Sequence, residues 1–129
     1  MCRVLDRFPT LEVVFLESGC GWVPFWLERM DEHHDNALAR KFGGTRSRSL
    51  RPSEYFRRQC YVSANADETF LAPVAAQIGA DRIVFSSDYP HPDAPYPHAV
   101  EEFLALPDLT DDQKRTILWD NTARLYHLD

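Results

Sequence analysis

Apolar and polar positions along the chain predict strands that alternate with helices. Apolar residues predominate in two short runs, residues 11–18 and 59–65, and in a third, residues 82–88, that leads into a loop with four prolines. In the first run the apolar residues are continuous rather than alternating, which is typical of a strand covered on both faces. We therefore expect strands at all three positions.

Helical patterns occupy the segments between and after these runs. Trp22, Trp26 and Met30 recur at every fourth position, which predicts an amphipathic helix that begins with Pro24 in its first turn and runs to residue 42. Two further helices are expected before the third run: residues 54–58, with Ser53 as the cap, and residues 67–78, with Gly79 as the stop and Pro73 as a kink or a later start. Three more are expected after it: residues 98–106, residues 111–119 behind a Thr110–Gln113 capping box, and residues 122–128 capped by Asn121.

The alternation of strands and helices predicts an α/β fold built from parallel βαβ units. A chain of 129 residues, 44% of them hydrophobic, suits a single domain over residues 1–129 with its own core. Parallel βαβ units carry functional groups at the carboxyl ends of their strands. The polar residues expected at that edge are Glu17, Ser18, Asn65, Asp67, Ser86, Ser87, Asp88 and His91.

Charge narrows the range of partners. The net charge of −6 argues against nucleic acid as the main partner, because phosphate binding needs a basic surface. Half of the 14 basic residues lie within residues 40–58, before the second expected strand. We expect the arginines among them to lie at the edge of the sheet opposite the functional groups, which disfavours Arg51 and Arg57 as substrate clamps.

Cysteine usage and hydropathy bear on location. Cys2, Cys20 and Cys60 are odd in number and far apart, which fits neither a disulfide framework nor a cysteine-rich zinc site, so we expect a reducing, cytoplasmic setting. Neither a signal-peptide pattern nor an apolar run long enough to span a membrane is apparent, and we expect no membrane partner.

Asp88 is the leading candidate for chemistry. A carboxylate at the end of a buried strand can ligate a divalent metal or act as a general base on a metal-bound water. Next to His91 it can also polarise an imidazole. The alternative is a structural role in which Asp88 accepts hydrogen bonds from backbone N–H groups of the following loop. The spacing S-D-x-x-H leaves both interpretations open.

Glu17, at the end of the first expected strand, presents the same choice between a ligand or acid–base role and an ion pair at the strand tip. His33 and His34 lie well inside a predicted helix, so we interpret them as surface or packing residues, since two histidines alone rarely form a metal site. His98 is expected to start a helix, and His127 lies close to residue 129 without an evident partner.

Four stretches in order resemble a known family: "RFPTLEVVFLESGCGWVPFWLERMDEH", "RPSEYFRRQCYVS", "DRIVFSSDYPHPD" and "ILWDNTARLYHL". They are similar to the C-terminal part of amidohydrolase-related TIM-barrel proteins, the branch that includes aminocarboxymuconate-semialdehyde decarboxylase and related aromatic-acid decarboxylases. The resemblance implies that the three strands are the sixth, seventh and eighth of a (β/α)₈ barrel.

The same resemblance assigns roles to individual residues. Asp88 matches the eighth-strand aspartate that ligates the metal, expected to be a divalent ion such as zinc, or serves in acid–base chemistry. His91 would line the mouth of the site. Glu17 lies near the end of the sixth strand, where the decarboxylase relatives carry a histidine, and this difference bears on whether the usual decarboxylation applies.

Other expected parts of the family's site lie outside this sequence. Metal binding in the family also uses an H-x-H pair on the first strand and a histidine on the fifth, and these 129 residues contain no H-x-H. A complete barrel takes about 250 residues. The chain is therefore expected to represent a C-terminal portion (a truncated product, a split subunit or a remnant), whose unpaired strand edges predict a homo-oligomer or a complex with a separate N-terminal half.

Three functions follow as hypotheses. The first is a metal-dependent hydrolase or decarboxylase of the amidohydrolase type, acting on a small carboxylated or cyclic substrate. The second is a catalytically inactive fragment or pseudoenzyme that keeps part of the fold and assembles through exposed strand edges. The third is a small α/β binding domain in which residues 87–93 form only a rigid loop. Fold alone does not choose among them.

Overall fold

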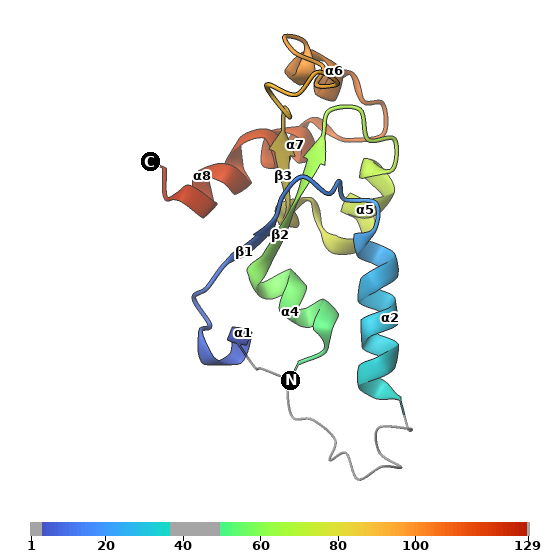
Figure 1. The fold of residues 1–129 in the computed structure, drawn as a ribbon, viewed down its shortest axis with the longest axis vertical. Helices are drawn as coiled ribbons and strands as arrows, with labels where there is room; N and C mark the ends of the chain where they lie inside the picture. The colour runs from blue at the N-terminus through green and yellow to red at the C-terminus, as the bar shows by residue number, and fades with distance from the viewer. Residues whose placement is uncertain (1–3, 37–49, 129) are drawn as a thin grey trace.

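The computed structural model describes residues 4–36 and 50–128. Its centre is a three-stranded sheet in the order β1-β2-β3, made of β1 (Val13–Phe15), β2 (Cys60–Asn65) and β3 (Ile83–Ser86) (Figure 1). Both pairs of neighbours are parallel, with Val13 opposite Cys60 and Val62 opposite Ile83. The expected parallel βαβ arrangement is confirmed, and all three strands end at the same edge of the sheet.

Helices connect and flank the strands. The helix α2 (Val23–Asp35) follows β1, and α5 (Leu71–Ile78) follows β2. After β3, a proline-rich loop leads to α6 (Ala99–Ala105), which lies beyond the carboxyl end of the sheet in Figure 1. The remaining elements are α1 (Val4–Arg7), α4 (Pro52–Gln59), the short 3₁₀ turn η1 (Ala80–Arg82), α7 (Asp111–Arg115), the π-helical turn η2 (Thr116–Asp120) and α8 (Asn121–Tyr126).

Several element boundaries differ from the sequence prediction. The strands are shorter than expected, and β1 keeps only three residues. The helix α5 starts at Leu71, so Pro73 marks a later start rather than a kink. The helix α2 ends at Asp35, and residues 37–42 of the expected helix lie outside the described residues. The capping box of Thr110 and Gln113 is confirmed, with reciprocal bonds of 2.9 and 3.2 Å.

Two expected helix caps are wrong, because tertiary partners take the side chains. Ser53 lies inside α4 and donates from its backbone N and its hydroxyl to the Asp31 carboxylate, at 3.0 and 2.6 Å, which ties α4 to α2. Asn121 is fully buried and donates from Nδ2 to the carbonyl oxygens of Ala80 and Ile83, at 2.8 and 2.6 Å. Asn121 therefore fixes the chain where it enters β3.

Burial is concentrated on the central strand. Five of the six residues of β2 are buried, and they pack against apolar side chains from the inner faces of the helices, such as Leu71, Phe103 and Ile117. The outer strand β1 is different: its last residue, Phe15, is 39% exposed, and Leu16, which follows it, is 62% exposed. Among the described residues, β1 and β3 each have a strand neighbour on one side only, which confirms the predicted open edges.

The arginines of α4 lie at the amino edge of the sheet, because α4 leads directly into the first residue of β2. Arg57 donates to the carbonyl oxygen of Gln77 at 3.2 Å, and Arg51 pairs with Asp35. Both are therefore distant in topology from the carboxyl edge, as the sequence predicts. None of the described helices is long and apolar enough to cross a membrane.

Candidate active site at the carboxyl edge of the sheet

Asp88 lies two residues beyond the end of β3. Its backbone has φ of 56°, a left-handed conformation that is uncommon for residues other than glycine, asparagine and aspartate. The Asp88 N–H donates to Ser86 Oγ at 3.3 Å, and the Asp88 carbonyl accepts from the His91 N–H at 3.0 Å. The side chain is 25% exposed. Asp88 thus begins a tight turn, and its carboxylate is partly screened from water.

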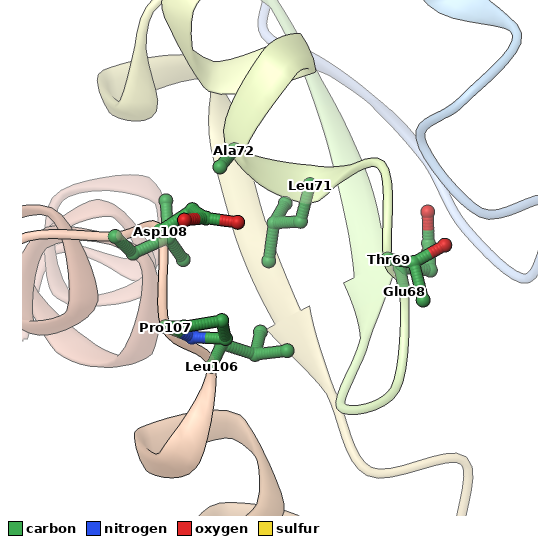
Figure 2. Close-up of a pocket in the computed structure, with 8 residues that line it drawn as sticks. Glu68, Thr69, Leu71, Ala72, Leu106, Pro107 and Asp108 are labelled. Carbon is green, nitrogen blue, oxygen red and sulfur yellow. The ribbon is translucent and has the colours of Figure 1, made fainter.

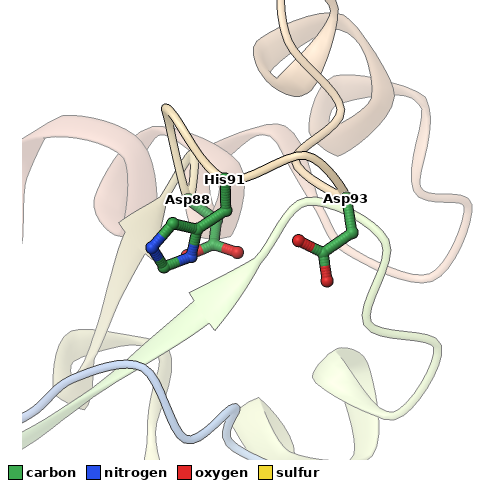
Figure 3. Close-up of side chains that lie close together, drawn as sticks. All are labelled: Asp88, His91 and Asp93. Carbon is green, nitrogen blue, oxygen red and sulfur yellow. The ribbon is translucent and has the colours of Figure 1, made fainter.

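His91 and Asp93 approach the Asp88 carboxylate. His91 Nδ1 lies 3.2 Å from Asp88 Oδ1, and one ligand atom from each of the three residues lies within 4.8 Å of the others. Figure 3 shows the three side chains gathered beside the end of β3. Asp93 was not singled out from the sequence, although the spacing D-x-x-H-x-D in residues 88–93 carries the signal.

The donor set suits a divalent cation. Two carboxylates and one imidazole are ligands that Mn²⁺ and Zn²⁺ accept. The 3.2 Å between His91 Nδ1 and Asp88 Oδ1 is the length of a direct ion pair, and it is also close to the separation of about 3 Å between neighbouring ligands of a small octahedral ion with bonds of about 2.1 Å. Asp88, His91 and Asp93 are therefore residues that could hold a metal ion.

The alternative role for Asp88, capping the following loop through its carboxylate, does not match the bonding. The described backbone donors of this loop bond other acceptors: the Ala94 N–H bonds the His91 carbonyl at 3.1 Å, and the Tyr89 N–H points to Ser87 Oγ at 3.5 Å. The partner of the Asp88 carboxylate is His91 Nδ1, at 3.2 Å.

Glu17 occupies a different position. It follows β1 by two residues, also has a positive φ, of 55°, and is exposed. It does not belong to the group of potential metal ligands found among the described residues, which consists of Asp88, His91 and Asp93. The structure therefore brings His91 to Asp88 but does not add Glu17 to this group.

Glu68 is a second carboxylate that sequence reasoning missed. It lies in the loop after β2, and its Oε2 accepts from Cys20 N at 2.8 Å and from Cys20 Sγ at 3.0 Å. Its Oε1 accepts from Asn65 N at 2.9 Å. Burial, and then the hydrogen bond to Glu68, raise the pKa of the Cys20 thiol far above its ordinary value. Cys20 is therefore a neutral donor to Glu68 at ordinary pH.

A shallow hollow of about 220 Å³ lies between α5 and the segment before α7. In Figure 2, Pro107 and Asp108 lie on one side of it and Glu68 and Thr69 on the other, with Leu71 between them. Neither this hollow nor a more open one of about 460 Å³ beside Asp67 is lined by Asp88, His91 or Asp93. The metal-capable group therefore lies outside both hollows.

Comparison with known proteins places the chain in a family. The family model described as "Amidohydrolase" matches residues 1–128. The chain belongs to the amidohydrolase family. This confirms the resemblance inferred from the sequence, and the three parallel strands correspond to part of the family's TIM barrel.

Aromatic-acid decarboxylases are among the relatives of this amidohydrolase chain. It is 28% identical to gamma-resorcylate decarboxylase of Polaromonas sp. and 30% identical to gamma-resorcylate decarboxylase of Rhizobium sp., in each case over 98% of this chain and 37% of the relative. The structure of 5-carboxyvanillate decarboxylase LigW from Sphingomonas paucimobilis matches with a TM-score of 0.77 and 33% identity, over 97% of this chain and 36% of that chain.

Two facts from these relatives bear on the site. The chain spans about a third of their length, so most of each relative has no counterpart in these 129 residues. The structure of dihydroxybenzoic acid decarboxylase from Polaromonas sp., 27% identical over 96% of this chain and with a TM-score of 0.72, contains manganese and the inhibitor 2-nitroresorcinol. A divalent metal is therefore established in this relative, and it is manganese rather than the expected zinc.

Proposed function

We propose that the chain supplies the Asp88-bearing part of a metal-dependent active site that removes a carboxyl group from a small aromatic acid. The observation that carries the proposal is the group of Asp88, His91 and Asp93 at the carboxyl edge of the parallel sheet. Decarboxylases predominate among the relatives reported above, which favours decarboxylation over hydrolysis.

In this proposal Asp88 and His91 would hold the cation, with Asp93 as a further oxygen donor. When bound, a divalent cation supplies a Lewis acid that orients an anionic substrate. Both zinc, as the sequence resemblance implies, and manganese, as in the Polaromonas relative, fit the donor set.

His91 also suits a proton-transfer role. Loss of carbon dioxide from a ring carbon leaves an electron pair that must receive a proton. The Asp88 carboxylate lies 3.2 Å from His91 Nδ1 and can accept a hydrogen bond from that nitrogen, which fixes the orientation of the ring. The His91 side chain is 57% exposed, so a proton at Nε2 is accessible to solvent and to a substrate above the sheet edge. His91 therefore either ligates the metal or carries this proton, and only an exchange of ligands would let it do both.

The proposal requires further groups from outside these residues. The H-x-H pair that the family resemblance implies is absent from these 129 residues, and the two open strand edges of the sheet need cover. We propose that these come either from a second copy of the chain or from a separate part of the barrel. Apolar side chains at and near the β1 edge, Leu11, Phe15 and Leu16, are exposed and suit such an interface.

Metal titration tests the proposed metal site. Isothermal titration of the purified chain with Mn²⁺ and, separately, with Zn²⁺ should give a single site, and Asp88→Asn should weaken it at least tenfold, because the amide brings no negative charge to the ion. Asp81→Asn is the matched control, since Asp81 is an exposed carboxylate at the amino end of β3. Binding unchanged in Asp88→Asn would remove Asp88 as a ligand.

A second candidate function, assembly without catalysis, is supported by a different feature of the structure. The open edges of β1 and β3, with exposed apolar side chains at and near β1, favour an assembling fragment without catalysis. This reading expects an oligomer that binds essentially no metal at stoichiometric concentrations. Sedimentation analysis together with elemental analysis separates the two functions, and a monodisperse monomer would contradict the assembling fragment.

A further inference from the structure

One carboxylate joins two loops at the functional edge of the sheet. The loop after β1 carries Glu17, and the loop after β2 carries Glu68. Glu68 Oε2 accepts from the Cys20 backbone N–H and thiol, while Oε1 accepts from the Asn65 backbone N–H. We propose that Glu68 is a positioning residue that fixes the loop between β1 and α2, and with it Glu17, at the edge where the metal-dependent site proposed above lies.

The loop residues packed against Glu68 suit this role. Gly19 has φ of 59°, and a Cβ atom on it would lie 3.2 Å from Glu68 Oε1. A side chain at residue 19 would be strained by this backbone conformation, and the Glu68 carboxylate would have to move by a few tenths of an ångström to admit it. Cys20 is fully buried, so its backbone N–H has no access to water and depends on Glu68 for its bond.

Trp22 extends the connection to the start of α2. Its indole Nε1 donates to the Gly19 carbonyl at 2.9 Å and lies 3.3 Å from Ser18 Oγ. The loop is thus held from both sides, by Glu68 at the Cys20 amide and by Trp22 at the Gly19 carbonyl. Releasing the first contact should alter the second, because the two contacts lie on adjacent residues of a short loop.

The pattern of donors requires a carboxylate at residue 68. All three groups that face its oxygens are donors: two backbone N–H groups and one thiol. A glutamine has one acceptor oxygen, so its NH₂ group would face a donor from Cys20 or from Asn65. An aspartate keeps both acceptors but is one methylene shorter, and it would lose the reach from the β2 loop to Cys20.

Indole resonances give the primary readout. The chain has three tryptophans, and Trp26 and Trp119 are 53% and 58% exposed, so their indole N–H signals serve as internal references. We expect Glu68→Gln to shift the Trp22 indole signal in a ¹H–¹⁵N spectrum and to leave the other two in place. It should also speed hydrogen exchange at the Cys20 and Asn65 amides at least tenfold, with core amides of β2 such as that of Val62 unchanged.

Asp67→Asn is the matched control, because Asp67 is the adjacent carboxylate and is exposed. Global unfolding would accelerate exchange at all sites alike; in that case Glu68→Asp, which keeps the charge and both acceptors, supplies the second test and should protect Asn65 but not Cys20. An unchanged Trp22 signal together with unchanged Cys20 exchange in either variant would overturn the positioning role.

The experiments distinguish a failure of this inference from a failure of the proposed function. The role assigned to Glu68 rests on the proposed function in one respect: the position of Glu17 matters for catalysis only if the active site lies at this edge of the sheet. If Asp88→Asn leaves metal binding intact while Glu68→Gln frees Cys20, the proposed site is wrong and the link between the loops stands. If metal binding depends on Asp88 but Cys20 and Asn65 are unaffected by Glu68→Gln, the positioning role is wrong and the site stands.

Discussion

The buried amide of Asn121 offers the sharpest test of how the fold is held. Asn121 lies at the start of α8 with no exposed surface, and its Nδ2 reaches the carbonyl oxygens of Ala80 and Ile83 at 2.8 and 2.6 Å. These two carbonyls flank the entry to β3, the strand that ends two residues before Asp88. Replacing Asn121 by leucine keeps a similar volume and removes both donors.

The magnitude follows from the two lost bonds. Each hydrogen bond contributes about 1 kcal/mol net, and leaving a buried acceptor without a partner adds a cost of about 1 kcal/mol or more. Asn121→Leu should therefore lower the free energy of unfolding by about 2–4 kcal/mol. A domain of this size has about 5–15 kcal/mol in total, so the loss is large. Asn121→Asp should cost at least as much at neutral pH, because a carboxylate would face two carbonyl oxygens.

Urea denaturation followed by tryptophan fluorescence measures this loss, with Gln77→Ala as the control because the Gln77 side chain is exposed. Asn121→Asp adds a pH test. Burial beside two acceptors raises the pKa of the introduced carboxyl in the folded state, so its protonated form is favoured there. Its penalty should then be smallest near pH 4 and grow as the pH rises to 7. A loss below about 0.5 kcal/mol in Asn121→Leu would refute the bonding argument.

Three other measurements test individual interactions that stabilise the fold. Gly19→Ala should destabilise the chain by about 1–2 kcal/mol in urea denaturation, because residue 19 has φ of 59° and the added methyl would meet Glu68; an effect under 0.3 kcal/mol would contradict this. Ser53→Ala should cost about 1–2 kcal/mol by removing the hydroxyl bond to Asp31, and a double-mutant cycle with Asp31→Ala should show coupling between them. The pKa of the Cys20 thiol is raised above its ordinary value of 9.0, so the folded state holds its proton more tightly and stability should fall as the pH rises above about 9. Cys20→Ala should flatten that decline in urea midpoints measured between pH 8 and 10.5, with part of the slope left by Cys60, whose thiol pKa is also raised by burial.

The sequence by itself determined the order and direction of the strands. Apolar runs separated by helical segments predict parallel βαβ units. Parallel strands cannot be joined by a two-residue turn and need a longer crossover connection, which is usually a helix. That topology was enough to place Asp88 and Glu17 at the carboxyl edge and Arg57 at the opposite edge. Local chemistry was also readable where it involves near neighbours, as in the Thr110–Gln113 capping box. The reason is that such bonds depend on spacing along one helix turn.

Only the tertiary structure decided which polar side chains meet. Ser53 and Asn121 have the residue types of helix caps, yet Asp31, 22 residues away, and Ala80, 41 residues away, take their hydrogen bonds. Glu68 belongs to an acidic stretch that reads as a helix start, but it binds Cys20, 48 residues earlier in the chain. Burial favours these distant partners, since a polar group removed from water costs free energy when it makes no hydrogen bond. The sequence pattern of a single helix or strand does not specify such a partner. For that reason the contact of Glu68 with Cys20, which joins the loops after β2 and β1, is seen only in the tertiary structure.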